Sequence, residues 1–206
     1  GIACNGERLE GEGVERIGRP EDDQRAGRTA FQGAPGAFSH EACIELRPWD
    51  EHVPFETFAE AIDAVKSGVC DCALIPVENS TIGVVEPAAT LVAQSSLDVV
   101  AEVWRQIRIA LMALPGADMA HLRTVHSHPV ALRQCTGKIG ALGLEVVEAF
   151  DTAGAAREVS EVGDPTRAAL APVAAAEVYG LSILRNDLQD SDTNRTRFVL
   201  LAREAG

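Results

Sequence analysis

Residues 145–179 read EVVEAFDTAGAAREVSEVGDPTRAALAPVAAAEVY and alternate between two apolar patterns. These patterns predict a strand at residues 145–149, a helix at 152–162, a strand at 168–171 and a helix at 172–179. Helices of about ten residues between short apolar strands are typical of a sheet covered by helices. We therefore expect an α/β fold with mostly parallel sheets.

The same alternation continues toward both ends of the chain. Short apolar runs predict further strands at residues 29–32, 72–77, 99–104, 107–114, 124–126 and 197–202. Helical spacing predicts further helices from residue 39 to about 46, over 55–65, at 87–93 and at 129–142. Ser39 is predicted to cap the first of these helices, and Gly68 to end the second.

The order of these segments indicates two lobes. The first would contain residues 28 to about 104 together with 190–206, and the second residues from about 105 to 189. The chain would then cross between the lobes twice, near Arg105 and near residues 187–194. Ligand sites commonly form at such boundaries and at the carboxyl ends of parallel strands. We therefore expect the functional site in a cleft between the lobes.

The composition argues against several classes of protein. The 206 residues carry a formal net charge of −13, whereas nucleic-acid binding needs a basic face. The sequence has neither an apolar run of about eighteen residues nor a basic segment followed by an apolar one at its start. We therefore expect no membrane partner. Residues 1–27 lack apolar periodicity and are expected to form a flexible tail.

The five cysteines are scattered along the chain and odd in number, which makes a poor disulfide framework. They fit a reducing, cytoplasmic location better than an oxidising one. Cys70 and Cys72 stand close together, but no histidine accompanies them at the spacing of a zinc site. We interpret them as small packing residues.

Small polar residues follow four of the predicted strands. They are Ser39, Asn79 with Ser80, Ser127 and Thr152. Because helix N-termini present free backbone N–H groups, several of them together would favour a small dianionic molecule. Each residue can also be interpreted as an ordinary helix cap or turn residue, and the pattern leaves that alternative open.

Three familiar kinds of catalytic centre are not indicated. Residues 33–36 are glycine-rich but are not followed by the Gly-Lys-Ser/Thr of a phosphate loop. His40, His126 and His128 lack metal-ligand spacing with an acidic partner. No Ser/His/Asp or Cys/His triad can be assembled. We therefore expect neither a metal nor a cofactor.

Taken in order, the polar segments resemble the prephenate dehydratase family. They are FQGAPGAFS at 31–39, IPVENSTIG at 75–83, SHPVALRQC at 127–135, DTA at 151–153, AAAEVYGL at 174–181 and NRTRF at 194–198. The resemblance runs from about Thr29 to Arg203. It implies a cofactor-independent enzyme of phenylalanine biosynthesis that converts prephenate to phenylpyruvate with loss of water and carbon dioxide.

The resemblance also implies a fold similar to the two-lobed periplasmic binding proteins of type II, and a homodimer. It makes Thr196 the catalytic residue, because the family's catalytic threonine opens the Thr-Arg-Phe motif. A threonine hydroxyl can donate a hydrogen bond that strengthens as charge develops on the leaving oxygen. Substrate binding is expected from Arg197, Asn79, Ser80, Ser127, Gln134, Thr152, Ser39 and Phe198. Arg197 suits a carboxylate because its guanidinium binds in a bidentate way.

The chain departs from the family pattern at three places. Ala37 stands where a threonine or serine is usual, and Asp151 stands where a serine is usual. The family often carries a C-terminal ACT domain for phenylalanine feedback, whereas the printed chain stops at Gly206. We expect the dehydratase domain without that regulatory domain, either because it is naturally absent or because it was removed.

Three alternatives share much of this pattern. Arogenate dehydratases have the same motifs and act on an amino analogue of prephenate. Non-aromatising prephenate decarboxylases resemble the family but would lack the acid of the Thr-Arg-Phe motif, whereas Thr196 is present. A solute-binding protein of the same architecture would normally carry a secretion signal.

Overall fold

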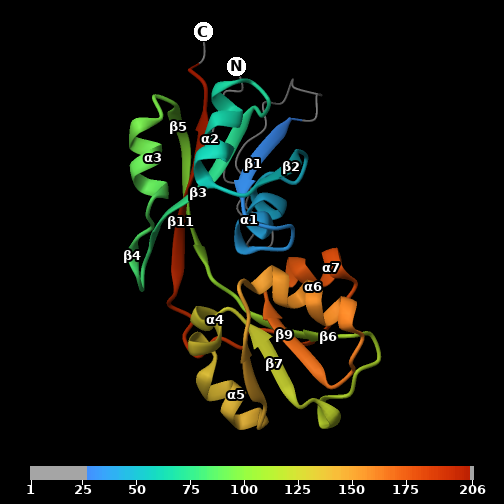
Figure 1. Ribbon diagram of the computed structural model, residues 1–206. Helices are drawn as coiled ribbons and strands as arrows, with labels where there is room; N and C mark the ends of the chain where they lie inside the picture. Colours follow the sequence, from blue (N-terminus) through green and yellow to red (C-terminus); the bar gives the residue numbers. More distant parts are fainter. Residues whose placement is uncertain (1–26, 205–206) are drawn as a thin grey trace. The chain divides into compact units, whose positions relative to one another are not determined.

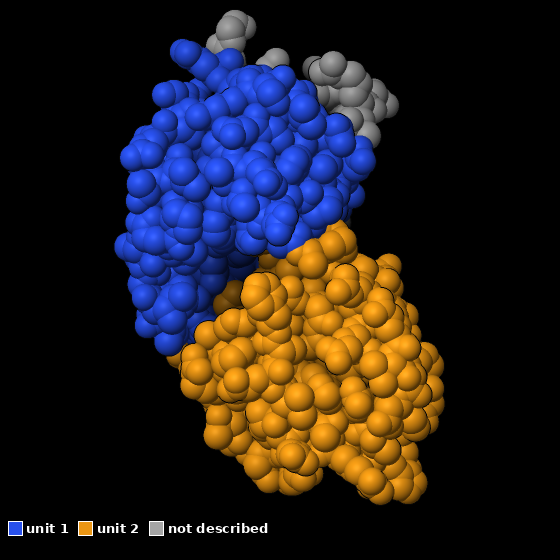
Figure 2. All heavy atoms as spheres, in the orientation of Figure 1, with its two compact units in different colours: residues 1–33, 42–106, 194–206 blue, residues 34–41, 107–193 orange. Residues whose placement is uncertain are grey.

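The computed structural model of the protein describes residues 27–204 (Figure 1). The chain divides into two compact units (Figure 2). Among the described residues, unit 1 contains residues 27–33, Ala42–Gln106 and residues 194–204, and unit 2 contains Ala34–Glu41 and Ile107–Thr193. The tail expected at residues 1–27 lies, apart from Gly27, outside the described residues.

Unit 1 is built on a mixed sheet with the strand order β2-β1-β3-β11-β5, and β4 pairs with β3. Its strands are β1 Arg28–Gln32, β2 Glu51–Phe55, β3 Cys72–Asn79, β4 Gly83–Val84, β5 Asp98–Gln106 and β11 Arg195–Ala202. Its helices are α1 Phe38–Leu46, the first part of which belongs to unit 2, α2 Phe58–Lys66 and α3 Ala88–Gln94. Strand β11 runs antiparallel to both of its neighbours.

The two faces of this sheet have separate apolar cores. Phe198 and Leu200 pack on the face that α1 covers, while Val199 and Leu201 pack on the face that α2 and α3 cover. This alternation follows from the strand period of two, which sends successive side chains to opposite faces. The buried strands β3 and β11 are therefore apolar on both faces over most of their length.

Unit 2 contains a second mixed sheet with the strand order β10-β6-β9-β7-β8. Its strands are β6 Ala110–Ala113, β7 Thr124–Ser127, β8 Glu145–Glu148, β9 Arg167–Ala171 and β10 Ser182–Arg185. The helices α4 Pro129–Gln134 and α5 Thr136–Leu142 pack on one face, and α6 Thr152–Val162 and α7 Val173–Tyr179 pack on the other. A 3₁₀ turn, Met119–His121, precedes β7.

The expected α/β class is observed, but the expectation of mostly parallel sheets is wrong. Within residues 27–204 four strand pairs are parallel and five are antiparallel. In unit 1 the antiparallel pairs arise mainly because β11, the last strand, lies between β3 and β5 and runs opposite to both. Apolar periodicity identifies a strand but carries no information about the direction of its neighbour.

Three smaller differences concern individual elements. The helix expected over residues 129–142 is two helices, because Cys135 leaves the helical conformation with a φ of −119°. Ser39 lies inside the first turn of α1 and is not its cap. Residues 34–41, expected in the first lobe, belong to unit 2, so the chain changes unit four times and not twice.

None of the helices in residues 27–204 has the length and apolar character that crossing a bilayer requires.

Candidate active site

The ends of β3 and β11 bring Asn79 and Thr196 together. Both side chains are buried, and the Asn79 amide nitrogen donates a hydrogen bond of 3.0 Å to the Thr196 hydroxyl oxygen. The same nitrogen donates at 2.9 Å to the side-chain oxygen of Asn194. The three residues thus form one polar cluster at the end of an otherwise apolar pair of strands.

The orientation of the Asn79 amide is fixed by the turn that follows it. Its oxygen accepts hydrogen bonds from the backbone N–H groups of Thr81 (2.9 Å) and Ile82 (3.1 Å). Because a backbone N–H can only donate, the amide oxygen must face the turn and the amide nitrogen must face Thr196. The Thr196 oxygen therefore accepts from Asn79, and its own proton is left to be donated elsewhere.

Asn194 and Ser80 hold the start of β11 against this turn. The Thr81 hydroxyl donates to the Asn194 side-chain oxygen at 3.3 Å. Ser80 bonds to Arg195 twice, since its N–H donates to the Arg195 carbonyl and its hydroxyl accepts from the Arg195 N–H, both at 2.8 Å. Ser80, expected to bind substrate, here joins two segments of backbone.

Sequence reasoning did not single out Asn194, although it lies in the NRTRF segment. The available signal was its place in that motif, since Asn194 immediately precedes β11 and stands two residues before Thr196.

Arg197 lies on the opposite face of the sheet from Thr196, as the alternation along β11 requires. Its guanidinium donates to Glu78 at 3.1 Å and to Glu102 at 3.2 Å, and it lies 6.0 Å from the centroid of the Trp104 ring. The positive charge of Arg197 is thus engaged by two carboxylates of the protein. Its expected role as a partner of a substrate carboxylate stays a prediction.

Two of the expected site residues in unit 2, Ser127 and Thr152, do not cap the helices that follow them. Ser127 is fully buried, and its hydroxyl donates to the Leu170 carbonyl at 2.7 Å, which joins β7 to β9. Thr152 is the first residue of α6, but Asp151 caps that helix by accepting from the N–H of Gly154. The interpretation of Ser127 and Thr152 as helix caps is therefore wrong.

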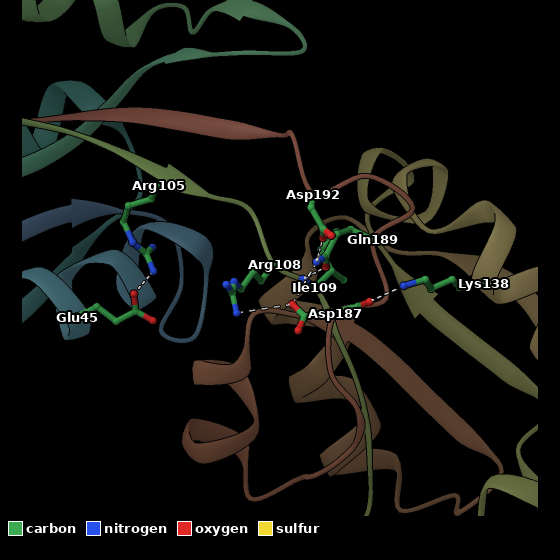
Figure 3. Close-up of polar contacts among 8 residues, drawn as sticks. All are labelled: Glu45, Arg105, Arg108, Ile109, Lys138, Asp187, Gln189 and Asp192. Atoms are coloured by element: carbon green, nitrogen blue, oxygen red, sulfur yellow. Dashed lines mark hydrogen bonds and ion pairs between the residues drawn. The ribbon is translucent and has the colours of Figure 1, made fainter. Parts of the chain in front are cut away.

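Gln134 ends α4 and is half-buried. Its carbonyl accepts at 2.8 Å from the N–H of Asp190, which belongs to the segment that returns to unit 1. The Asp190 carboxylate in turn accepts from Gly137 and Lys138 in the first turn of α5. In the same segment, Gln189 accepts at 2.9 Å from the N–H of Ile109 (Figure 3). The break after Gln134 is thus held in place by hydrogen bonds.

The loop before α1 belongs to unit 2 because it approaches α7 closely. Tyr179 donates its hydroxyl to the Pro35 carbonyl at 2.6 Å, and Glu41 accepts from the N–H of Ala174 at 3.1 Å. Gly36 has a φ of +87°, and a Cβ there would lie 3.0 Å from the Ala175 Cα. Only glycine suits such a position. These contacts position Ser39, which is buried.

Of the nine expected site residues, the structure joins Asn79 and Thr196 directly, with Ser80 in the adjoining turn. Phe198 is 2% exposed and belongs to the apolar core beneath α1, so in this structure it is a packing residue. The residues in unit 2 are Ser39, Ser127, Gln134 and Thr152, which lie on α1, β7, α4 and α6 respectively.

The described cysteines are buried and poorly suited to chemistry. Cys70 and Cys72 are each 1% exposed and belong to the core, which confirms their interpretation as packing residues. Burial raises the pKa of the Cys43 thiol far above its ordinary value, and burial raises the pKa of Cys135 to about 12. Within residues 27–204 no group of three or more His, Cys, Asp or Glu side chains is arranged to hold a metal ion.

Comparison with curated proteins gives relatives over most of the chain. The bifunctional N-acyl-homoserine lactone acylase/prephenate dehydratase of Komagataeibacter europaeus is 42% identical over 174 residues, 84% of this chain and 62% of that protein. The chloroplastic arogenate dehydratase/prephenate dehydratase 1 of Arabidopsis thaliana is 40% identical over 183 residues, 89% of this chain and 46% of that protein. The chain therefore spans less than two thirds of the length of these relatives.

Solved structures are also similar to most of this chain. GqqA, described as a novel type of quorum quenching acylase, matches with a TM-score of 0.80 at 41% identity, covering 87% of this chain and 65% of that one. The prephenate dehydratase of Arthrobacter aurescens in complex with L-Phe matches with a TM-score of 0.76 at 28% identity, covering 87% of this chain and 61% of that one. These matches confirm the α/β fold class.

A family model described as prephenate dehydratase matches residues 29–206, a span that includes all of the motifs. With the Asn79–Thr196 cluster, the fold and these relatives in agreement, the chain belongs to the prephenate dehydratase family.

Proposed function

We propose that the chain catalyses the decarboxylating dehydration of prephenate to phenylpyruvate, a step in the biosynthesis of phenylalanine. The observation that carries this proposal is the buried hydrogen bond from Asn79 to Thr196, with the Asn79 amide held in one orientation by two backbone N–H groups. Family membership supports the proposed substrate class, and the hydrogen-bond direction supports the proposed role of Thr196.

For this reaction the protein has to position the substrate and to supply one proton to the leaving oxygen. As the ring carboxylate leaves as carbon dioxide, the electrons of the broken C–C bond enter the ring, and the opposite C–O bond breaks to complete an aromatic system. The ring itself receives the electrons, so no electron sink is needed. The departing oxygen gains negative charge and must leave as water.

Thr196 is suited to that last task in the proposed mechanism. Its oxygen accepts from Asn79, so its O–H donates to the leaving oxygen, and the hydrogen bond strengthens as charge develops there. The Asn79 N–H supports the Thr196 oxygen while the proton is shared, because hydrogen bonds in a chain polarise one another. Asn79 is in this scheme a positioning residue, and Thr196 is the acid.

Product identification tests the proposal. The purified chain is incubated separately with prephenate and with arogenate, and the products are separated by chromatography and identified by mass. Phenylpyruvate from prephenate supports the proposal. Phenylalanine from arogenate alone would make the chain an arogenate dehydratase, and a product that keeps the ring hydroxyl would make it a decarboxylase.

A second candidate function has one observation in its favour. The relative from Komagataeibacter europaeus and the structure of GqqA both carry acylase in their descriptions, at 42% and 41% identity. Incubation with an N-acyl-homoserine lactone, followed by measurement of the free fatty acid, tests this activity. Thr196→Ala should leave it unchanged if the two activities use different residues.

We further propose a cytoplasmic location and a homodimer. The reducing compartment is supported by the buried thiols Cys43, Cys70, Cys72 and Cys135, none of which forms a disulfide within residues 27–204. Static light scattering coupled to size exclusion tests the dimer, because the chain mass of 21.8 kDa and its double are well separated.

A further inference from the structure

Arg105 lies beside Thr196 in the sheet of unit 1. The pairing of β11 with β5 places Thr196 opposite Arg105, and the pairing of β11 with β3 places Thr196 opposite Asn79. Residues directly opposite one another on neighbouring strands point to the same face, with Cβ atoms about 4.5–5.5 Å apart. Asn79, Thr196 and Arg105 therefore form one row across three strands, on the face that α1 covers.

The Arg105 side chain runs along this face to α1, where it forms an ion pair with Glu45 (Figure 3). The Arg105 side chain is 14% exposed, whereas that of Glu45 is 43% exposed. A guanidinium carries five N–H donors in a planar fork and binds carboxylates in a bidentate way. Arg105 thus places a permanent positive charge in the row that holds the proposed acid.

Arg197, the cation expected from the motif, is on the other face. Its neighbours across the strands are Glu78 and Trp104, and its guanidinium bonds to Glu78 and Glu102. A ligand that contacts Thr196 on the α1 face would have Arg105 as its neighbouring cation. Arg197 is separated from that face by the sheet itself.

We propose that Arg105 binds a carboxylate of the substrate and that Glu45 holds the guanidinium in place when no substrate is bound. This inference rests on the proposed function. The carboxylate in question is that of the pyruvyl side chain, which the product keeps. A strong ion pair to the ring carboxylate would be lost as carbon dioxide departs, and would therefore stabilise the ground state more than the transition state.

Substitution of Arg105 tests the contact. Arg105→Gln removes the charge and should raise KM for prephenate about tenfold to a hundredfold, the range for a charge-assisted hydrogen bond to a carboxylate, with a smaller effect on kcat. Arg28→Gln is the matched control, because Arg28 also belongs to an ion pair of unit 1, with Glu51, but at the opposite end of the sheet. The control should change KM by less than about twofold.

Glu45→Gln tests whether the Glu45–Arg105 ion pair affects substrate binding or only stability. If Glu45 and the substrate compete for Arg105, the substitution should lower KM by roughly twofold to fivefold, the size of a half-exposed ion pair. The gain should vanish in the Arg105→Gln background, because both effects act through one guanidinium. Glu51→Gln controls for the loss of one negative charge from unit 1 and should leave KM unchanged. A purely structural Glu45–Arg105 pair predicts instead that Glu45→Gln lowers Tm without lowering KM.

Binding of phenylpyruvate gives a readout that does not depend on turnover. Calorimetry should show the Kd for phenylpyruvate raised at least about tenfold in Arg105→Gln and unchanged in Arg28→Gln. Unaltered KM and unaltered product binding in a folded Arg105→Gln protein would overturn the inference, as would a rise in KM in Arg197→Gln alone. A wild-type chain that turns over neither prephenate nor arogenate would instead refute the proposed function.

Discussion

At the scale of single residues, the direction of one hydrogen bond determines what Thr196 can do. The turn N–H groups fix the Asn79 amide, the amide nitrogen donates to Thr196, and the Thr196 proton is left for an acceptor other than Asn79. Asn79 and Thr196 are 117 residues apart in the sequence, yet both could be selected from the family motifs. Arg105 could not, because apolar periodicity does not reveal which residue of β5 lies opposite Thr196.

Thr196→Ala tests the acid directly. Because the proposed hydrogen bond matters mainly in the transition state, the substitution should lower kcat by ~10²–10⁴-fold with little change in KM. Thr196→Ser keeps the hydroxyl and should retain much more activity. Steady-state kinetics with prephenate measure both. An unchanged Tm in Thr196→Ala would exclude a general loss of structure, and near wild-type kcat in that protein would refute the role of Thr196.

Asn79→Asp tests the direction of the hydrogen bond with almost no change in shape. The new carboxylate still accepts from Thr81 and Ile82, but it can donate neither to Thr196 nor to Asn194, so the Thr196 proton should turn toward this carboxylate and away from the ligand. We expect kcat to fall at least about a hundredfold, as for a lost oxyanion-type contact, with Tm within a few degrees of wild type. A kcat unaffected by the exchange would show that the Asn79 donor has no catalytic role.

At the scale of secondary structure, the helices and the buried strands were the predictable part. The helix expected at 152–162 has those bounds in the structure, because Asp151 supplies a cap and Gly163, with a φ of +73°, ends it. The strands β2, β4 and β10 were not predicted. β4 has only two residues, and β2 and β10 are edge strands of five and four residues. Such strands depend on tertiary pairing more than on their own apolar pattern.

The cap of α6 gives a prediction at this scale. Asp151→Ala removes the side chain that accepts from Gly154 and should lower the free energy of unfolding by about 1 kcal/mol. Asp151→Ser, the residue usual in the family, also caps helices well and should recover most of that loss. Urea unfolding of the three proteins measures the difference. Equal midpoints for Asp151→Ala and wild type would show that the cap contributes nothing to stability.

At the scale of the whole molecule, the sequence indicated two lobes and placed the end of the second lobe near residue 190. It did not indicate that the loop at 34–41 belongs to unit 2. That loop is joined to unit 2 through long-range contacts of Tyr179 and Glu41, which no local pattern encodes. The helix α1 therefore begins in unit 2 and ends in unit 1. Local periodicity predicts elements well, whereas the assignment of an element to a unit depends on contacts between distant residues.

Buried thiols in both units should make the folded state sensitive to alkali. Burial raises the pKa of Cys135 from an ordinary 9.0 to about 12, and burial also raises the pKa values of Cys43 and Cys70. A raised pKa means that the folded state keeps the proton that the unfolded state loses. The stabilising contribution is therefore complete below about pH 9 and is lost as the pH rises from about 9 toward 12.

Cys135→Ser isolates one of these thiols, because serine does not titrate in this range. Between pH 9 and pH 10 the free energy of unfolding of the wild type should fall by about 1 kcal/mol more than that of the variant, if the folded state keeps the Cys135 proton throughout this range. All other titratable groups are common to the two proteins, so their contributions cancel in the comparison. Urea unfolding at pH 7.5, 9 and 10 provides the measurement, and any constant cost of the substitution appears at pH 7.5. Parallel pH profiles for the two proteins would mean that the Cys135 thiol ionises as readily in the folded state as in the unfolded one, contrary to its complete burial among the apolar residues of unit 2.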